Sequence, residues 1–167
     1  MRSAIPTTIA CLVLVGLLSV NSIAGSGQKE DPAQTLIKAT KFLEERPFDK
    51  DAKKVRGWAL GWVIETDKVS VNVCSLILQV DKKYKYGSEL TGQYTIGMAA
   101  FKLANPDKAS DENAAQLAGI ESAIISYESM VKAESKAQNT FMDQLVARKA
   151  DGSLPQFVLE NNCKEKK

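Results

Sequence analysis

Apolar positions recur at helical spacing along most of the chain after residue 30. The first such segment follows Asp31-Pro32, a favoured N-cap residue with proline in the first helical turn. This helix must end near Arg46, because Pro47 disfavours helical geometry in the residue before it. A second helix, capped by Asp49 or Asp51, extends to about residue 64. Its apolar stripe consists of Ala52, Val55, Ala59, Trp62 and Val63. Two helices joined by so short a turn predict an antiparallel hairpin.

The helical spacing returns in the second half of the chain. A helix is predicted from Ser88 until Asn105-Pro106 closes it. The longest helix then runs from Asp111 to Glu134, with an a/d-like stripe of Leu117, Ile120, Ile124, Tyr127 and Val131. A last pair of helices is predicted. The first covers 137–149 and is stopped by Asp151-Gly152, and the second begins at Ser153 and continues towards Cys163.

The stretch 69–80 is ambiguous. Residues 69–73 alternate as in a strand, whereas 74–78 form a continuous apolar run around Cys74. A lone strand needs a partner, and no second strand pattern is convincing. We therefore predict a buried helix here, and an all-α fold: a single compact helical domain of about six or seven helices, spanning 31–163 and followed by a solvated tail, 164–167.

The amino-acid composition excludes several kinds of catalytic and metal site. Of 167 residues, 44% are hydrophobic, 25% are charged and none is histidine. The absence of histidine removes Ser-His-Asp and Cys-His catalysis and His-ligated zinc or haem. Nucleotide-binding glycine motifs and the Gly-x-Ser-x-Gly nucleophile motif are also missing. The sequence therefore predicts a protein that is not an enzyme, with no catalytic residue, no cofactor and no metal.

The N-terminus predicts export. Arg2 precedes the apolar run 9–20, and Ser22-Ile23-Ala24 places small residues at a cleavage site. We expect a cleaved signal peptide over 1–24 and a flexible leader over 25–30, so that the protein is periplasmic or extracellular. An uncleaved membrane anchor is the alternative, although the run is shorter than the roughly 20 residues that span a bilayer.

Cleavage changes the charge and cysteine balance. The net charge falls from +2 to +1, which gives no reason to expect a nucleic acid partner. Loss of Cys11 leaves Cys74 and Cys163, which predict a disulfide bond in an oxidising compartment. A redox-active pair is the alternative, but no Cys-x-x-Cys spacing supports it.

A basic and aromatic stretch is the most site-like local feature: Lys82, Lys83, Tyr84, Lys85 and Tyr86. Interleaved cations and aromatics suit contact with a partner, while the alternative is a solvated loop whose tyrosines lean on the core. Gly92 and Gly97 weaken a helix interior, which indicates close approach to a neighbouring helix. We add both glycines to the candidate contact surface. Trp58 and Trp62, four residues apart, are predicted to be core residues.

The general plan resembles that of small periplasmic all-helical proteins that work by binding, such as acid-stress chaperones and immunity proteins that neutralise imported cell-wall amidases. The shared features are the signal sequence, disulfide-linked helices and a Tyr-x-x-Gly step at Tyr94 to Gly97. They transfer no functional residue.

We therefore expect a non-enzymatic protein that binds another extracytoplasmic protein and has no stable membrane anchor after cleavage. The second hypothesis is a carrier of a small hydrophobic ligand or lipid, because apolar residues occupy more than one face of 58–64. The third is a hydrolase that uses carboxylates, with Glu89 and Glu121 as candidates because they lie in apolar-rich helices.

Overall fold

Six α-helices account for most of the residues that the computed structural model describes, which are 30–74, 79–81, 83–161 and 163. The helices are α1 (Pro32–Glu45), α2 (Ala52–Glu65), α3 (Gly87–Ala104), α4 (Glu112–Ala133), α5 (Thr140–Asp151) and α6 (Leu154–Asn161). No strand occurs within the described ranges, and no helix in them is long and apolar enough to cross a membrane. The all-α prediction is confirmed, whereas the predicted signal peptide and tail lie outside these ranges.

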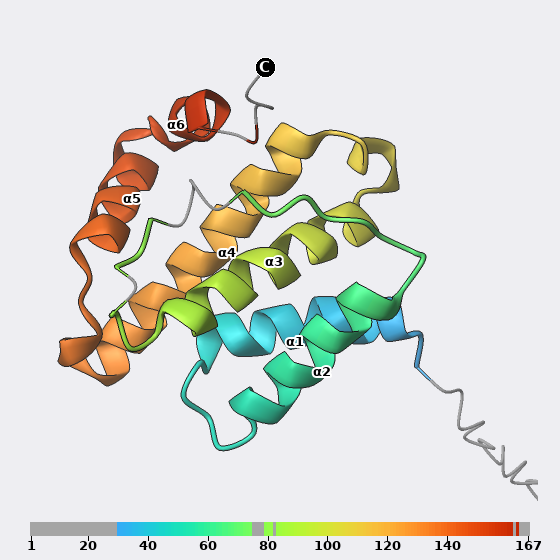
Figure 1. Ribbon diagram of the computed structural model, residues 1–167, viewed down its shortest axis with the longest axis horizontal. Coiled ribbons are helices and arrows are strands. Elements are labelled where there is room, and N and C mark those ends of the chain that lie inside the picture. The colour runs from blue at the N-terminus through green and yellow to red at the C-terminus, as the bar shows by residue number, and fades with distance from the viewer. Residues whose placement is uncertain (1–29, 75–78, 82, 162, 164–167) are drawn as a thin grey trace, which may run out of the picture.

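The antiparallel helices α3 and α4 form the centre of the fold (Figure 1). Helices α1 and α2 pack on one side of this pair, and α5 and α6 pack against α4 on the other. Two apolar clusters result. One joins α3 and α4 to α5 and α6, and the second joins α1 and α2 to the outer face of α3.

Glycine allows α3 and α4 to approach closely. A Cβ added at Gly97 would lie 2.6 Å from Ser122 Cβ, and one added at Gly119 would lie 2.7 Å from the Tyr94 carbonyl oxygen. Real Cβ atoms do not come so near, so the two backbones touch at this level. The close approach predicted from Gly97 is confirmed, and Gly119 is its counterpart on α4.

Local signals set most helix ends. The Asp31 side chain accepts a hydrogen bond from the Ala33 N–H at 3.2 Å, and Asp111 caps α4 by accepting from the Ala114 N–H at 3.0 Å. Gly152 ends α5 with a φ of +80°, a left-handed conformation that glycine adopts without strain. Helix α5 begins later than predicted, because the Asn139 side chain caps it at Thr140.

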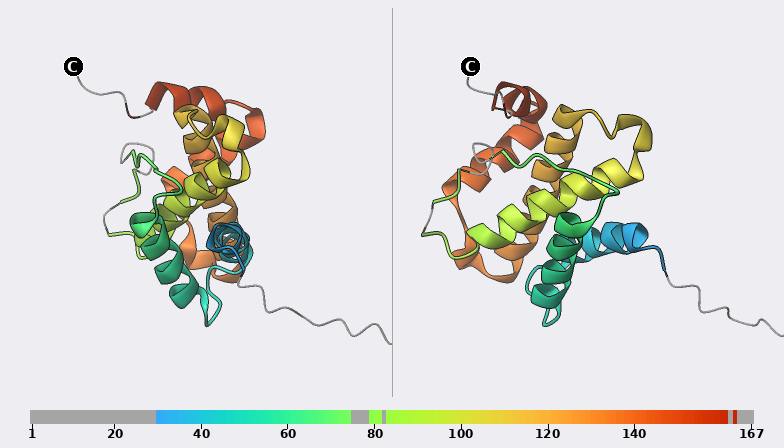
Figure 2. Two further views of the ribbon diagram at one scale, coloured as in Figure 1. Left: turned by 90° about the vertical axis from the view of Figure 1, so that its right-hand side faces the viewer. Right: turned by 45° about the vertical axis from the view of Figure 1, so that its right-hand side comes forward.

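The predicted buried helix over 69–80 is wrong for its described residues. Residues 66–74, 79–81 and 83–86, here called the strap, contain no helix and lie over α3 and α4 on the same side as α2 (Figure 2). Half-buried Val69 and Val71 pack on the core, and the Ser70 carbonyl oxygen accepts a hydrogen bond from Lys102 Nζ at 2.9 Å. An extended chain advances about 3.3 Å per residue against 1.5 Å in a helix, so the strap reaches across both helices.

A buried polar network joins α1 to the central pair. Gln93 Nε2 donates to the Thr40 carbonyl oxygen at 3.2 Å and to Ser122 Oγ at 2.8 Å, and Ser122 donates in turn to the Glu44 carboxylate. Ser126 donates to the Leu43 carbonyl oxygen at 3.2 Å. These bonds orient α1, because each of its last two turns is bonded to α3 or α4.

Replacing Glu44 by glutamine should stabilise the protein at neutral pH. Burial raises the pKa of Glu44, although the Ser122 hydrogen bond opposes this shift. A raised folded-state pKa means that stability is highest below the unfolded pKa and declines as pH rises through the folded pKa. Glutamine keeps an acceptor for Ser122 and carries no charge. We expect a gain below about 1 kcal/mol at pH 7, because the carboxyl is only half-buried.

The measurement is urea unfolding at pH 7 and at pH 4, where the difference from the wild type should shrink. Glu45→Gln is the matched control, because Glu45 is exposed and should respond little. A Glu44→Gln variant less stable than the wild type at pH 7 would show instead that the charge is favourable, through nearby Lys41 and Lys149.

Candidate binding surface

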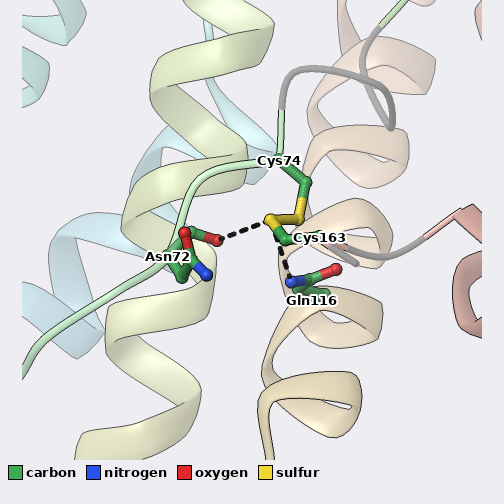
Figure 3. Close-up of a disulfide and its surroundings, with 4 residues drawn as sticks. All are labelled: Asn72, Cys74, Gln116 and Cys163. Atoms are coloured by element: carbon green, nitrogen blue, oxygen red, sulfur yellow. Dashed lines mark hydrogen bonds between the residues drawn. A yellow bond between two sulfur atoms is a disulfide. The ribbon is translucent and has the colours of Figure 1, made fainter. Parts of the chain in front are cut away.

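The two predicted disulfide partners lie together. Cys74 belongs to the strap and Cys163 follows α6, and their Cα atoms are 5.3 Å apart, inside the usual range for a disulfide (Figure 3). Gln116 Nε2 of α4 lies 3.6 Å from Cys163 Sγ, and the Asn72 carbonyl oxygen lies 3.9 Å from the same sulfur. This pair links the strap and the C-terminal segment across α4.

The tyrosines of the basic and aromatic stretch point inward. Tyr84 Oη donates to the Ala137 carbonyl oxygen, and Tyr86, which is 5% exposed, donates to the Glu134 carboxylate. Burial raises the pKa of Tyr84 to about 12, so its hydroxyl remains a donor at neutral pH. These contacts attach the strap to the segment between α4 and α5.

The lysines of the same stretch are exposed. Lys83 and Lys85 face solvent, while Lys82 lies outside the described residues. Lys85 Nζ lies 4.8 Å from the centre of the Tyr86 ring and 3.0 Å from its hydroxyl oxygen. The tyrosines of the predicted site therefore hold the loop against the fold, whereas its described lysines are at the surface.

Phe48 completes this surface from another part of the chain. It lies in the turn between α1 and α2, is 39% exposed, and has its ring centroid 5.0 Å from that of Tyr86. The only sequence signal for an exposed Phe48 is its place after Pro47 in a short turn, where a large side chain is hard to bury. We call Phe48, Lys83, Tyr84, Lys85 and Tyr86 the aromatic-basic face.

An open groove adjoins the aromatic-basic face. It has a volume of about 550 Å³ and lies between the α1–α2 turn, α2 and the start of α3. Its lining includes Pro47, Phe48, Ala52, Lys53, Arg56, Leu60, Ser88 and Glu89. We call it the Arg56 groove. Because Phe48 belongs to both features, the groove and the aromatic-basic face form one continuous surface.

Gly92 and Gly97 are not part of an exposed contact surface, because both are buried between helices. Gly97 faces α4, as described above. A Cβ on Gly92 would lie 3.3 Å from Arg56 Cδ and 3.3 Å from Leu60 Cδ1, so Gly92 gives these two side chains of α2 room against α3. Gly92 therefore contributes to the Arg56 groove only by leaving room for Arg56 and Leu60, which line it.

The core prediction for the tryptophans is wrong for Trp58, which is 40% exposed, and Trp62 is half-buried. Helix α2 turns Ala52, Ala59 and Val63 towards the core, and Trp58 lies about 100° around the helix from Ala59. Trp58 instead lines a second groove of about 680 Å³, between α1 and α2, with Ala39, Phe42 and Val55.

The two candidate carboxylates do not meet. Glu89 lies in the first turn of α3 and accepts a hydrogen bond from Ser88, whereas Glu121 precedes Ser122, which packs at the level of Gly97. Eight helical residues separate Glu89 from that level, or about 12 Å along the axis. Within the described part of the chain, no group of three or more acidic or cysteine side chains could hold a metal ion.

The surface so assembled comes from three segments that are distant in sequence: the α1–α2 hairpin, the end of the strap and the first turns of α3. No protein-family model, curated protein sequence or solved structure significantly matches this chain.

Proposed function

We propose that this protein is an exported, non-enzymatic binding protein that contacts another extracytoplasmic protein through the aromatic-basic face. The observation that carries the proposal is the exposed Phe48 ring packed on Tyr86, whose ring Lys85 also contacts, with Lys83 exposed in the same loop. Aromatic side chains are enriched at protein interfaces, where they supply large contact areas. The bonds of Tyr84 and Tyr86 hold the loop in place, which lowers the entropy that binding would cost.

Two features support the exported setting. The first 24 residues have the order of a signal peptide, with a basic start, an apolar run and small residues at the exit. Cys74 and Cys163 lie at disulfide distance, and disulfides persist in oxidising compartments. The proposal therefore places the partner outside the cytoplasm, as an inhibitor's target, a neutralised toxin or a chaperone's client would be.

Charge reversal at the exposed lysines tests the proposal. We expect Lys83→Glu combined with Lys85→Glu to weaken capture of the partner at least about tenfold, since like charges across an interface are unfavourable. Phe48→Ser should act in the same direction by removing exposed apolar area. The measurement is a cross-linked pull-down from the extracytoplasmic fraction of the source, with the oxidised protein as bait.

Two controls separate binding from folding. Lys108→Glu reverses an exposed lysine beyond the far end of α3 and should leave capture unchanged. Tyr84→Phe removes only the bond to Ala137, so it should loosen the strap without changing the charge of the aromatic-basic face. Its effect on capture measures what the loosened strap contributes, separately from the charge. Partner capture that survives both the lysine and the Phe48 variants would contradict the proposal.

A second candidate function is carriage of a small hydrophobic ligand. The groove between α1 and α2 favours it, because its volume of about 680 Å³ and its lining by Phe42, Val55 and Trp58 suit an apolar molecule. A native mass spectrum of the purified protein distinguishes the two functions: a co-purified ligand lost in Trp58→Ser supports carriage, and the bare chain mass speaks against it.

A further inference from the structure

Arg56 of α2 is a half-buried cation with few partners. Its Nη2 lies 3.5 Å from the Pro47 carbonyl oxygen, and its Nε is buried with no hydrogen-bond partner among the described residues. None of the ion pairs found in the described ranges includes Arg56. A guanidinium carries five N–H donors, and a buried N–H without a partner, as at Nε, costs free energy.

The fold holds Arg56 in this position. Its aliphatic stem lies against α3 at Gly92, where a Cβ would be only 3.3 Å from Arg56 Cδ. Burial lowers the pKa of Arg56, while the charge of Glu89 raises it without forming an ion pair. The guanidinium therefore lines the Arg56 groove as a cation that is partly shielded from water.

The acidic groups of the groove already have donors of their own. The Asp49 carboxylate accepts from Arg46 and from the Asp51 N–H at 2.9 Å, and Glu89 accepts from Ser88 at 2.9 Å. Lys53, on the same groove, is exposed. Asp49 is neutralised by Arg46, which leaves the cations Lys53 and Arg56 against the single carboxylate of Glu89, so the groove keeps a net positive charge. This charge lies next to apolar walls formed by Pro47, Phe48 and Leu60.

We propose that the Arg56 groove receives an acidic side chain of the protein partner, with its carboxylate on the Arg56 guanidinium and a neighbouring apolar side chain against Phe48 and Leu60. This inference rests on the proposed binding function and names the chemistry of its partner. Guanidinium and carboxylate match as two parallel hydrogen bonds, which a partly buried groove strengthens. The walls select a carboxylate carried on an apolar segment rather than a free inorganic anion.

The test uses phenylacetate, which joins a carboxylate to an apolar ring, and phenylacetamide, its neutral analogue. The full oxidised chain is labelled with ¹⁵N and titrated with each compound by NMR. We expect saturable shifts of the Arg56 side-chain signal and the Ser88 amide with phenylacetate, weakened by salt, and at least about tenfold weaker binding of phenylacetamide. Equal binding of the two compounds, or no saturable shift, would overturn the inference without requiring any variant.

Variants then locate the site. Arg56→Met should weaken phenylacetate binding about tenfold, and Arg56→Lys should keep only part of it, because lysine cannot pair in the same two-pronged way. Arg148→Met is the matched control, since Arg148 is exposed on α5 and lies over the Phe157 ring, away from the groove. Wild-type affinity in Arg56→Met would overturn the assignment.

Partner capture separates this inference from the function on which it rests. Arg56→Met should reduce capture in the pull-down as charge reversal of Lys83 and Lys85 does. If Arg56→Met keeps the partner and the lysine variant loses it, the inference is wrong and the proposed function stands. If the wild type captures no partner, the proposed function fails, whereas Arg56-dependent phenylacetate binding would still assign the groove to a carboxylate.

Discussion

Replacing both Cys74 and Cys163 by serine is expected to lower the free energy of unfolding by about 4–5 kcal/mol. The two residues are 89 positions apart, and cross-linking so long a loop removes much of the entropy of the unfolded chain. Most small domains are stable by only about 5–15 kcal/mol, so the variant should lose a large share of its stability. Urea unfolding of the oxidised wild type and the double variant measures the difference.

Loss of the disulfide should destabilise the strap in particular, in addition to the protein as a whole. The described residues of the strap are attached by the Lys102 bond to the Ser70 carbonyl oxygen and by the bonds of Tyr84 and Tyr86 to the segment between α4 and α5. Lys102 is 7% exposed and is also paired with Glu112, so it remains a firm contact. Without the link at Cys74, we expect the amide hydrogens of 66–74 to exchange faster than they do in the oxidised wild type, by a larger factor than those of α3 and α4.

Reductant supplies the control for the cysteine variant. The wild type with dithiothreitol should unfold like the double variant, and the double variant should not respond to dithiothreitol. Equal stability of the oxidised wild type and the double variant would contradict the prediction. It would mean that the packing of Val69 and Val71 and the hydrogen bonds of the strap hold it in place without the disulfide.

Helix ends were predictable because their signals are local. Asp31-Pro32, Asp111 and Gly152 each act within a few residues of the helix end that they define. A side-chain oxygen that accepts from a nearby N–H, or a glycine with positive φ, needs no information from distant parts of the chain. The antiparallel α1–α2 and α3–α4 pairs follow from the short connections between these helices.

The strap was not predictable in the same way. The sequence contains no partner strand for an extended segment at 69–80, which favoured a helix there, but an extended chain also persists when side chains hold it. Here the holding groups are Lys102, Cys163 and Ala137, which lie 32, 89 and 53 positions from their partners. Such pairings appear only when the helices have been placed relative to one another.

The candidate surface was predictable in part. Alternating lysines and tyrosines marked the loop, yet the inward direction of Tyr86 depends on Glu134, 48 residues away. The partial burial of Arg56 could not be predicted from the sequence, because a single arginine in an amphipathic helix usually faces solvent. Its partial burial depends on Gly92 of α3, whose missing side chain leaves room for the arginine stem.

The contact between α3 and α4 leads to the second large effect: Gly119→Ala should lower the free energy of unfolding by about 2–3 kcal/mol. The added Cβ would lie 2.6 Å from Met98 Cγ and 2.7 Å from the Tyr94 carbonyl oxygen. Met98 can move aside, but a backbone oxygen moves only with its helix, so α3 and α4 must separate. Overpacking usually costs about 1–3 kcal/mol and occasionally more, and a clash with a backbone oxygen belongs at the upper end, at about 3–4 kcal/mol. The roughly 1 kcal/mol by which alanine favours a helix offsets part of this cost and leaves the net loss of about 2–3 kcal/mol.

Gly61→Ala is the matched control for this substitution, because it places the same methyl group in α2 where nothing lies within 4 Å except the nearby chain of its own helix. With no clash, helix propensity alone should act and raise stability by about 0.5–1 kcal/mol. The two alanine variants should therefore differ by roughly 2.5–4 kcal/mol in urea unfolding, with opposite signs relative to the wild type. A Gly119→Ala variant as stable as Gly61→Ala would mean that α3 and α4 are not in backbone contact. Gln93 of α3 bonds both Thr40 of α1 and Ser122 of α4, and this network requires α3 and α4 to lie close together. The same result would therefore also contradict the way in which the network positions α1.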